Sequence, residues 1–188
     1  MSKLLEFGVR PDTSQGGYAV NVKEIVDIFK STSLFDGLGE DDLKNIAEGC
    51  TEQAYPMGTV IIEENDPPRE QLYIIKRGEI VVTTGKIDDE DMDVDEGQFI
   101  TTLGEGDAFG EIALIDEMPH SATVKTISDS IVILLPAAHF YQLVETNSKI
   151  GYIVVRNIAK IICNRLRQSN FITKHFVTWG VPDESAEC

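Results

Sequence analysis

Short runs of apolar and β-branched residues, separated by turn residues, fill the middle of this chain and limit its fold more than any other feature. The runs that begin after Ala54 are 60–62, 72–75, 80–82, 99–100, 122–124 and 131–134. Glycine, proline and aspartate gather between them, at 57–58, 66–68, 77–78, 104–107 and 128–129. Short strands with turns at such close intervals are typical of a β-sandwich or a β-barrel.

Helical periodicity precedes and follows these runs. Apolar residues spaced three and four apart predict a helix over 22–30, and acidic residues after Gly39 predict the start of a second one, since the positive end of the helix dipole favours them. The same period returns after Pro136. We therefore expect an α+β, mainly β domain, with helices on both sides of its strands.

These patterns also divide the chain. We expect a flexible N-terminal arm at 1–21, one domain at 22–170 and a tail at 171–188. Within the domain, the strands span about 54–135 and the C-terminal helices about 137–168.

The charge of the chain limits the kinds of partner that we expect it to bind. Thirty-two acidic residues against 16 basic ones give a formal net charge of −16, which repels phosphate backbones and anionic lipids, so we expect neither nucleic acid nor membrane as a direct partner. The three cysteines, Cys50, Cys163 and Cys188, have no metal-ligand spacing and are typical of reduced thiols in the cytosol. With no signal-peptide pattern at the start, we expect a cytoplasmic protein.

An acidic stretch at 86–97 separates two of the runs. Its Asp91, Asp93 and Asp95 alternate as in a calcium loop, but the turn glycine and the bidentate glutamate are missing from their positions, so a solvated hairpin loop is the stronger interpretation. The histidines are too scattered for a metal cluster, and no nucleophile–base arrangement is recognisable. We expect no metal and no catalytic activity.

One stretch, by contrast, has the residues of an anion-binding pocket. Gly110 lets the backbone approach a ligand closely, and 111–114 predict a short helix whose first N–H groups face an anion. Ala113 is small enough to expose its N–H, and Ser121 and Ala122 offer two further backbone donors.

Residues 104–124, with FGEIAL followed by PHSATV, resemble the phosphate-binding cassette of cyclic nucleotide-binding domains. Upstream segments match the family in order, at 34–38, 55–58, 64–66, 72–75 and 78, so the resemblance covers roughly 30–168. It implies an eight-stranded, jelly-roll-like β-roll with a short helix inside the cassette. It also implies cAMP or cGMP as the ligand, bound by Gly110, Glu111, Ile112, Ala113, His120, Ser121 and Ala122, with Glu111 accepting a hydrogen bond from the ribose 2′-hydroxyl.

His120 departs from the family pattern, in which binding members usually have arginine nine residues after the glutamate. Arginine supplies a permanent charge and a two-pronged donor for phosphate, whereas an imidazole with a pKa of about 6.5 is mostly neutral at cytosolic pH. The change costs roughly 1.5–3 kcal/mol of binding free energy. A bound phosphate would recover part of this by raising the pKa of the histidine, with affinity increasing as pH falls.

These observations leave two functions open. The first is a non-catalytic sensor that binds a cyclic nucleotide and signals through its C-terminal helix to a separate effector protein, with Arg165, Arg167 or an aromatic side chain of the tail capping the base. The second is a degenerate fold that acts in protein–protein interaction or dimerisation. Residues 151–163 are apolar on more than one face, which favours a homodimer through the helix at 150–166 in either case.

Overall fold

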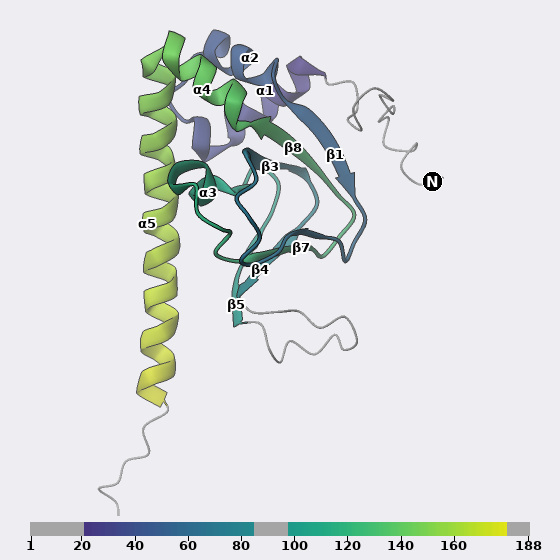
Figure 1. The fold of residues 1–188 in the computed structure, drawn as a ribbon. Coiled ribbons are helices and arrows are strands. Elements are labelled where there is room, and N and C mark those ends of the chain that lie inside the picture. The colour runs from purple at the N-terminus through teal and green to yellow at the C-terminus, as the bar shows by residue number, and fades with distance from the viewer. Residues whose placement is uncertain (1–20, 85–97, 180–188) are drawn as a thin grey trace, which may run out of the picture.

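Two antiparallel sheets form the centre of the computed structural model, which describes residues 21–84 and 98–179 (Figure 1). One sheet has the order β1 (Thr51–Tyr55), β8 (Ser130–Pro136), β3 (Gln71–Arg77), β6 (Ala108–Phe109). The other has the order β2 (Val60–Ile62), β7 (Thr123–Thr126), β4 (Ile80–Thr84), β5 (Gln98–Leu103). The described residues thus contain eight strands in a β-roll flanked by helices, which confirms the predicted fold class.

The central strands of the first sheet are buried on both faces, which is why the sequence shows continuous apolar runs there. Leu72 and Ile74 of β3 pack toward the helices, while Tyr73 and Ile75 point into the roll. The residues of β8 alternate in the same way between the two cores. Burying both faces of these strands removes much apolar surface from water and joins the helices to the roll.

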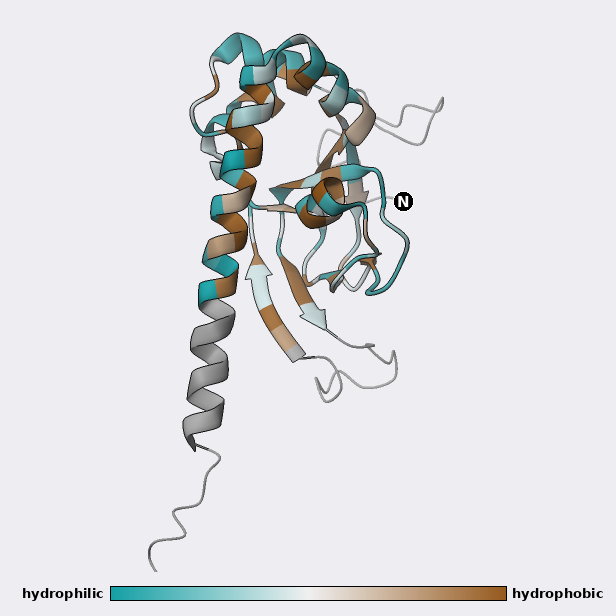
Figure 2. Cartoon of the chain, turned by 60° about the vertical axis from the view of Figure 1, so that its left-hand side comes forward, coloured by the Kyte–Doolittle hydropathy of each residue, from teal (hydrophilic) through white to brown (hydrophobic). Residues whose placement is uncertain are grey.

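The helices cover one end and one side of the roll. They are α1 (Val22–Ser31), the short 3₁₀ helix η2 (Ser33–Phe35), α2 (Glu40–Ala47), α4 (Ala137–Thr146) and α5 (Ser148–Trp179), with α3 inside the cassette. Figure 2 shows hydrophobic residues on the part of α5 that lies beside the other helices and the roll. The predicted apolar face of the first helix is confirmed, since Ile25, Val26 and Phe29 are buried.

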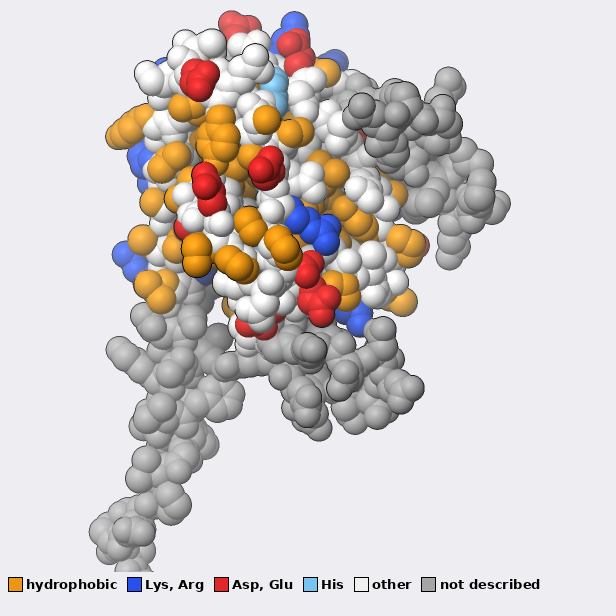
Figure 3. Space-filling model, in the orientation of Figure 1, with side chains coloured by type: hydrophobic (Ala, Val, Ile, Leu, Met, Phe, Trp, Pro, Cys, Tyr) orange, Lys and Arg blue, Asp and Glu red, His pale blue; other side chains and the backbone are white. Residues whose placement is uncertain are grey.

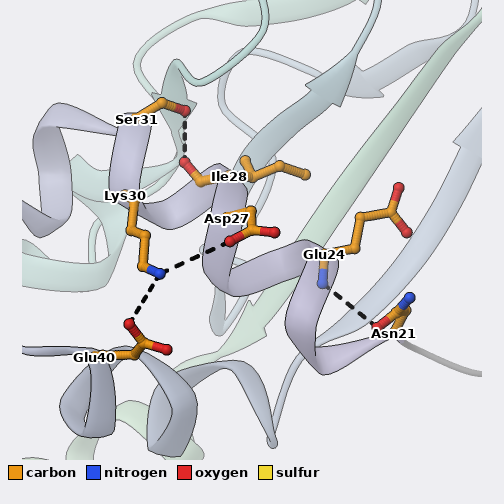
Figure 4. Close-up of polar contacts among 7 residues, drawn as sticks. All are labelled: Asn21, Glu24, Asp27, Ile28, Lys30, Ser31 and Glu40. Carbon is orange, nitrogen blue, oxygen red and sulfur yellow. Dashed lines mark hydrogen bonds and ion pairs between the residues drawn. The ribbon is translucent and has the colours of Figure 1, made fainter.

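Polar contacts fix the ends of α1 (Figure 4). The side chain of Asn21 accepts a hydrogen bond from the Glu24 N–H, so this residue of the expected arm is the N-cap of the helix. At the other end, Lys30 pairs with Asp27 in its own helix and with Glu40 at the start of α2. These ion pairs are exposed and add little stability, so apolar packing holds α1 against α2.

Helix α5 is attached to the N-terminal helices through a buried amide. The Asn157 side chain, 2% exposed, donates to the carbonyl oxygens of Leu34 and Asp36 at 3.0 and 2.9 Å. The helix then continues to Trp179, beyond the boundary expected at 168, so that the first part of the expected tail is helical. The predictions for the arm at 1–20, the acidic loop at 86–97 and Cys188 lie outside the described residues.

Candidate ligand-binding site

A cavity of about 420 Å³ lies between the cassette, the second sheet and α5. Its volume is in the range of small-molecule sites. The described residues that line it are Ile62, Val82, Ile100, Thr101, Phe109, Gly110, Glu111, Ile112, Ala113, Pro119, His120, Ser121, Ala122, Val124, Ile162, Arg165 and Leu166. All of the site residues expected from the sequence are thus brought together around one cavity.

The predicted short helix is present as α3 (Glu111–Asp116), and Gly110 determines where it begins. Gly110 has a φ of +78°, and a Cβ at this position would lie 2.9 Å from the Cδ2 atom of Tyr73. Both the backbone angle and the space therefore require glycine. The first N–H groups of a helix lack intrahelical acceptors, so the N–H groups of Ile112 and Ala113 have none within α3.

Glu111 is the buried acceptor of the cavity and is paired with a residue of α5. Its side chain is 2% exposed, and the Nη1 group of Arg165 donates to its Oε1 atom at 2.5 Å. The Nη2 group of Arg165 donates to the carbonyl oxygen of Ala108 at 2.7 Å. Burial raises the pKa of Glu111, and the positive charge of Arg165 opposes this rise.

His120 is buried and is hydrogen-bonded to the segment that precedes β3. Its ring, in a residue that is 6% exposed, accepts a hydrogen bond at Nε2 from the backbone N–H of Arg69 at 3.2 Å. An accepting Nε2 carries no proton, so the imidazole is neutral with its proton on Nδ1. Burial and the charge of Arg69 lower the pKa of His120 while Asp66 raises it, and the net lowering opposes the recharging of this histidine that the sequence led us to expect.

The walls of the cavity are mainly apolar, and sequence analysis did not predict them as part of the site. Ile62, Val82 and Val124 come from the second sheet, and Ile162 and Leu166 come from α5. Their apolar character was visible in the sequence, but only as a signal for packing. Arg167, considered as a base cap together with Arg165, is exposed and is absent from the described lining.

Among the described residues, no group of three or more histidine, cysteine, aspartate or glutamate residues is arranged to hold a metal ion. His139 instead lies 3.0 Å from the Asn45 carbonyl oxygen, measured from its Nε2 atom, and joins α4 to α2. No described helix has the length and apolarity needed to cross a membrane.

Comparison with known proteins finds the same fold in cyclic nucleotide-binding domains. A regulatory domain of Toxoplasma gondii protein kinase A, solved with cAMP, is 28% identical with a TM-score of 0.55, over 71% of this chain and 46% of that one. A cyclic nucleotide-binding domain from Methylobacillus flagellatus superposes with a TM-score of 0.67 at 23% identity, over 87% of this chain and 86% of that one.

The curated relatives are much longer proteins. Glutaminase 1 of Bradyrhizobium diazoefficiens is 28% identical over 137 residues, which are 73% of this chain and 20% of that protein. The chain spans only 20–24% of the length of this enzyme and of several matching regulatory subunits of cAMP-dependent protein kinases. Residues 52–147, about half of the chain, match the family model of the cyclic nucleotide-binding domain. The chain therefore belongs to the cyclic nucleotide-binding domain family.

Proposed function

We propose that this chain is a non-catalytic regulatory module that binds cAMP or cGMP and signals through α5 to a separate effector protein in the cytoplasm. The observation that carries the proposal is the buried Glu111 beside the left-handed Gly110, at the floor of a cavity that α5 helps to close. A buried carboxylate in an otherwise mainly apolar cavity is costly and needs polar partners. Arg165 supplies one of them to Oε1, and a ribose hydroxyl would supply a further donor.

The residues of the cavity divide among the parts of a cyclic nucleotide. Glu111 accepts from the 2′-hydroxyl, and the N–H groups of Ala113, Ser121 and Ala122 donate to the cyclic phosphate. The apolar walls hold the base. The presence of cAMP in the related Toxoplasma gondii domain supports a ligand of this class.

Two exposed surfaces support signalling to a partner, and the first is an apolar surface on α3. Ile112, Ile115 and Met118 are exposed on α3 and just after it. Hydrophobic side chains gather on the face of the molecule that the space-filling view shows (Figure 3). Because Ile112 also lines the cavity, a ligand would contact this surface directly. An effector that covers an apolar patch beside the cavity would therefore respond to its occupancy.

The outer face of α5 supports a homodimer through the helix at 150–166. Tyr152, Val155, Ala159, Ile162 and Leu166 are separated alternately by three and four residues, the spacing of a coiled-coil seam. Tyr152, Val155 and Leu166 are exposed in the isolated chain. Since Ile162 and Leu166 also line the cavity, the dimer seam would adjoin the ligand.

A second candidate function is a protein-interaction module that no longer binds a nucleotide. The observation in its favour is His120, which is neutral and already hydrogen-bonded to the Arg69 N–H. This module would assemble tightly whether or not a nucleotide is present. Light scattering of the purified chain, with and without cAMP, tests this module: we expect the same assembly in both, and a monomer contradicts assembly through α5.

Titration calorimetry of the purified chain with cAMP and cGMP tests the sensor. We expect binding by the unaltered chain and at least roughly tenfold weaker binding by Glu111→Gln, which loses a charged hydrogen-bond acceptor. Glu117→Gln is the matched control, because Glu117 is exposed and lies outside the described lining. Absence of heat at millimolar cAMP and cGMP would contradict the sensor and favour the interaction module.

A further inference from the structure

Arg165 has a position in the cavity that base capping does not explain. It approaches from α5, and both of its terminal nitrogens are directed to the floor of the site, one to Glu111 and one to the Ala108 carbonyl. We propose that Arg165 binds the anionic group of the ligand and so determines that the cavity selects a charged nucleotide over an uncharged nucleoside. This inference rests on the proposed function, because it assigns a residue of the same site.

The first step is that His120 is unable to supply the charge. Its Nε2 atom accepts from the Arg69 N–H, and burial and Arg69 hold its pKa below the ordinary value for histidine. The ring therefore has one N–H, on Nδ1, and no positive charge near neutral pH. A phosphate at this position would gain at most a single neutral hydrogen bond from the side chain.

The second step is that Arg165 is the one permanently charged cation among the described lining residues. Arg69 lies next to His120 in the fold but is outside that lining, and its guanidinium is 3.6 Å from the carboxylate of Asp66. Among the described lining residues, the positive side chain that an anion can contact is therefore Arg165 of α5. The Glu111 carboxylate balances part of this charge, so an anion gains mainly from the N–H donors of the guanidinium that the bonds to Glu111 and Ala108 leave over.

The third step is the reach of the guanidinium. It has five N–H donors, of which the bonds to Glu111 and Ala108 use two, and its side chain is 28% exposed. In a 3′,5′-cyclic nucleotide, the carbon that carries the phosphate-bound 3′-oxygen is adjacent to the carbon that carries the 2′-hydroxyl. A ligand whose 2′-hydroxyl reaches Glu111 thus places its phosphate beside the group already bonded to Glu111.

Because Arg165 belongs to α5, its contact with the ligand would affect this helix. A charged ligand would add a bond between the floor of the cavity and the helix, whereas a nucleoside would fill the same space without it. The negative charge of the ligand would then interact directly with a residue of α5. In this arrangement, the residue that selects the ligand belongs to the helix that transmits the signal.

Two other roles for Arg165 would change ligand affinity differently when the side chain is removed. If Arg165 only competes with the ribose for Glu111, its removal tightens binding. If it stacks on the base, its removal weakens cAMP and adenosine equally. Adenosine is the decisive probe, because it has the same base and ribose as cAMP and lacks the phosphate.

The experiment measures the affinities of cAMP and adenosine for the unaltered chain, Arg165→Gln and Arg167→Gln. We expect Arg165→Gln to weaken cAMP about 10- to 100-fold and adenosine by less than about threefold. Any effect that acts through the unpaired Glu111 would change both ligands, since both carry the ribose. Arg167→Gln, an exposed change two residues along the same helix, should alter neither affinity.

Equal weakening of both ligands, or tighter binding of cAMP, overturns the role of Arg165. Failure of the unaltered chain to bind either cAMP or cGMP overturns the proposed function itself, and the inference with it. A second measurement needs no variant: the ratio of the cAMP and adenosine affinities should be the same at pH 6 and pH 8. A ratio that rises several-fold at pH 6 would assign the phosphate to a protonated His120 and contradict the inference.

Discussion

At the scale of single residues, Glu111 and Gly110 explain why the cassette needs its particular sequence. Glu111 is a buried carboxylate whose pKa burial raises, and the partner that opposes this rise arrives from α5, far along the chain. Gly110 supplies the left-handed turn that places Glu111 at the first position of α3. The residue before the glutamate is therefore as restricted as the glutamate itself.

Replacing Gly110 with alanine tests this restriction. Gly110→Ala combines left-handed backbone strain with a Cβ that would lie 2.9 Å from the Tyr73 ring, so we expect a loss of roughly 2–4 kcal/mol in the free energy of unfolding. Gly58→Ala is the control, because Gly58 has a φ of +85° with no described atom near its Cβ position. It should lose only about 1 kcal/mol, from strain alone.

Urea denaturation of the two variants provides the comparison. The contact with Tyr73 is the source of the difference between them. Equal losses for Gly110→Ala and Gly58→Ala would show that the ring moves aside freely, and that backbone strain alone restricts Gly110.

At the scale of elements, the sequence predicted best where an element is buried in a regular pattern. The strands β3 and β8 were found as continuous apolar runs, and α1 by its single apolar face. Strand β1 was missed because its sequence TEQAY has no apolar run, and β6 because it has only two residues. Both strands form by pairing with neighbours, β1 with β8 and β6 with β3, and local sequence contains little of that information.

The attachment of α5 to the N-terminal turn belongs to the same scale. Asn157→Leu would leave the carbonyl oxygens of Leu34 and Asp36 without their buried donor, so we expect a loss of roughly 1–3 kcal/mol in the free energy of unfolding. Asn164→Leu makes the same chemical change at an exposed position of the helix and should change stability by less than about 0.5 kcal/mol. Thermal unfolding followed by circular dichroism measures both.

A loss of stability that is the same for Asn157→Leu and Asn164→Leu would mean that the amide does not hold α5 in place. The apolar contacts of Ile150, Val154 and Ile158 would then suffice for docking the helix. We expect that both the buried amide and these apolar contacts are needed.

At the scale of the whole molecule, the site consists of one part that is local in sequence and one that is not. Gly110 to Ala122 lie within a single turn and helix, so their shared cavity could be predicted from spacing and resemblance. Arg165 is 54 residues from Glu111, and only the path of α5 across the roll brings them together. The sequence indicated Arg165 only as one of several candidate base caps, and its pairing with Glu111 was not predicted. The apolar walls were hidden, because a residue that lines a cavity and one that fills a core look alike in sequence.

The central claim is that a cyclic nucleotide occupies the cavity with its ribose on Glu111. A crystal structure of the full chain grown with cAMP tests it most directly. The account predicts nucleotide density between the cassette and α5, with the 2′-hydroxyl within hydrogen-bond distance of Glu111 and the phosphate beside Arg165. Clear density for cAMP outside this cavity, or an empty cavity at millimolar cAMP, would contradict it.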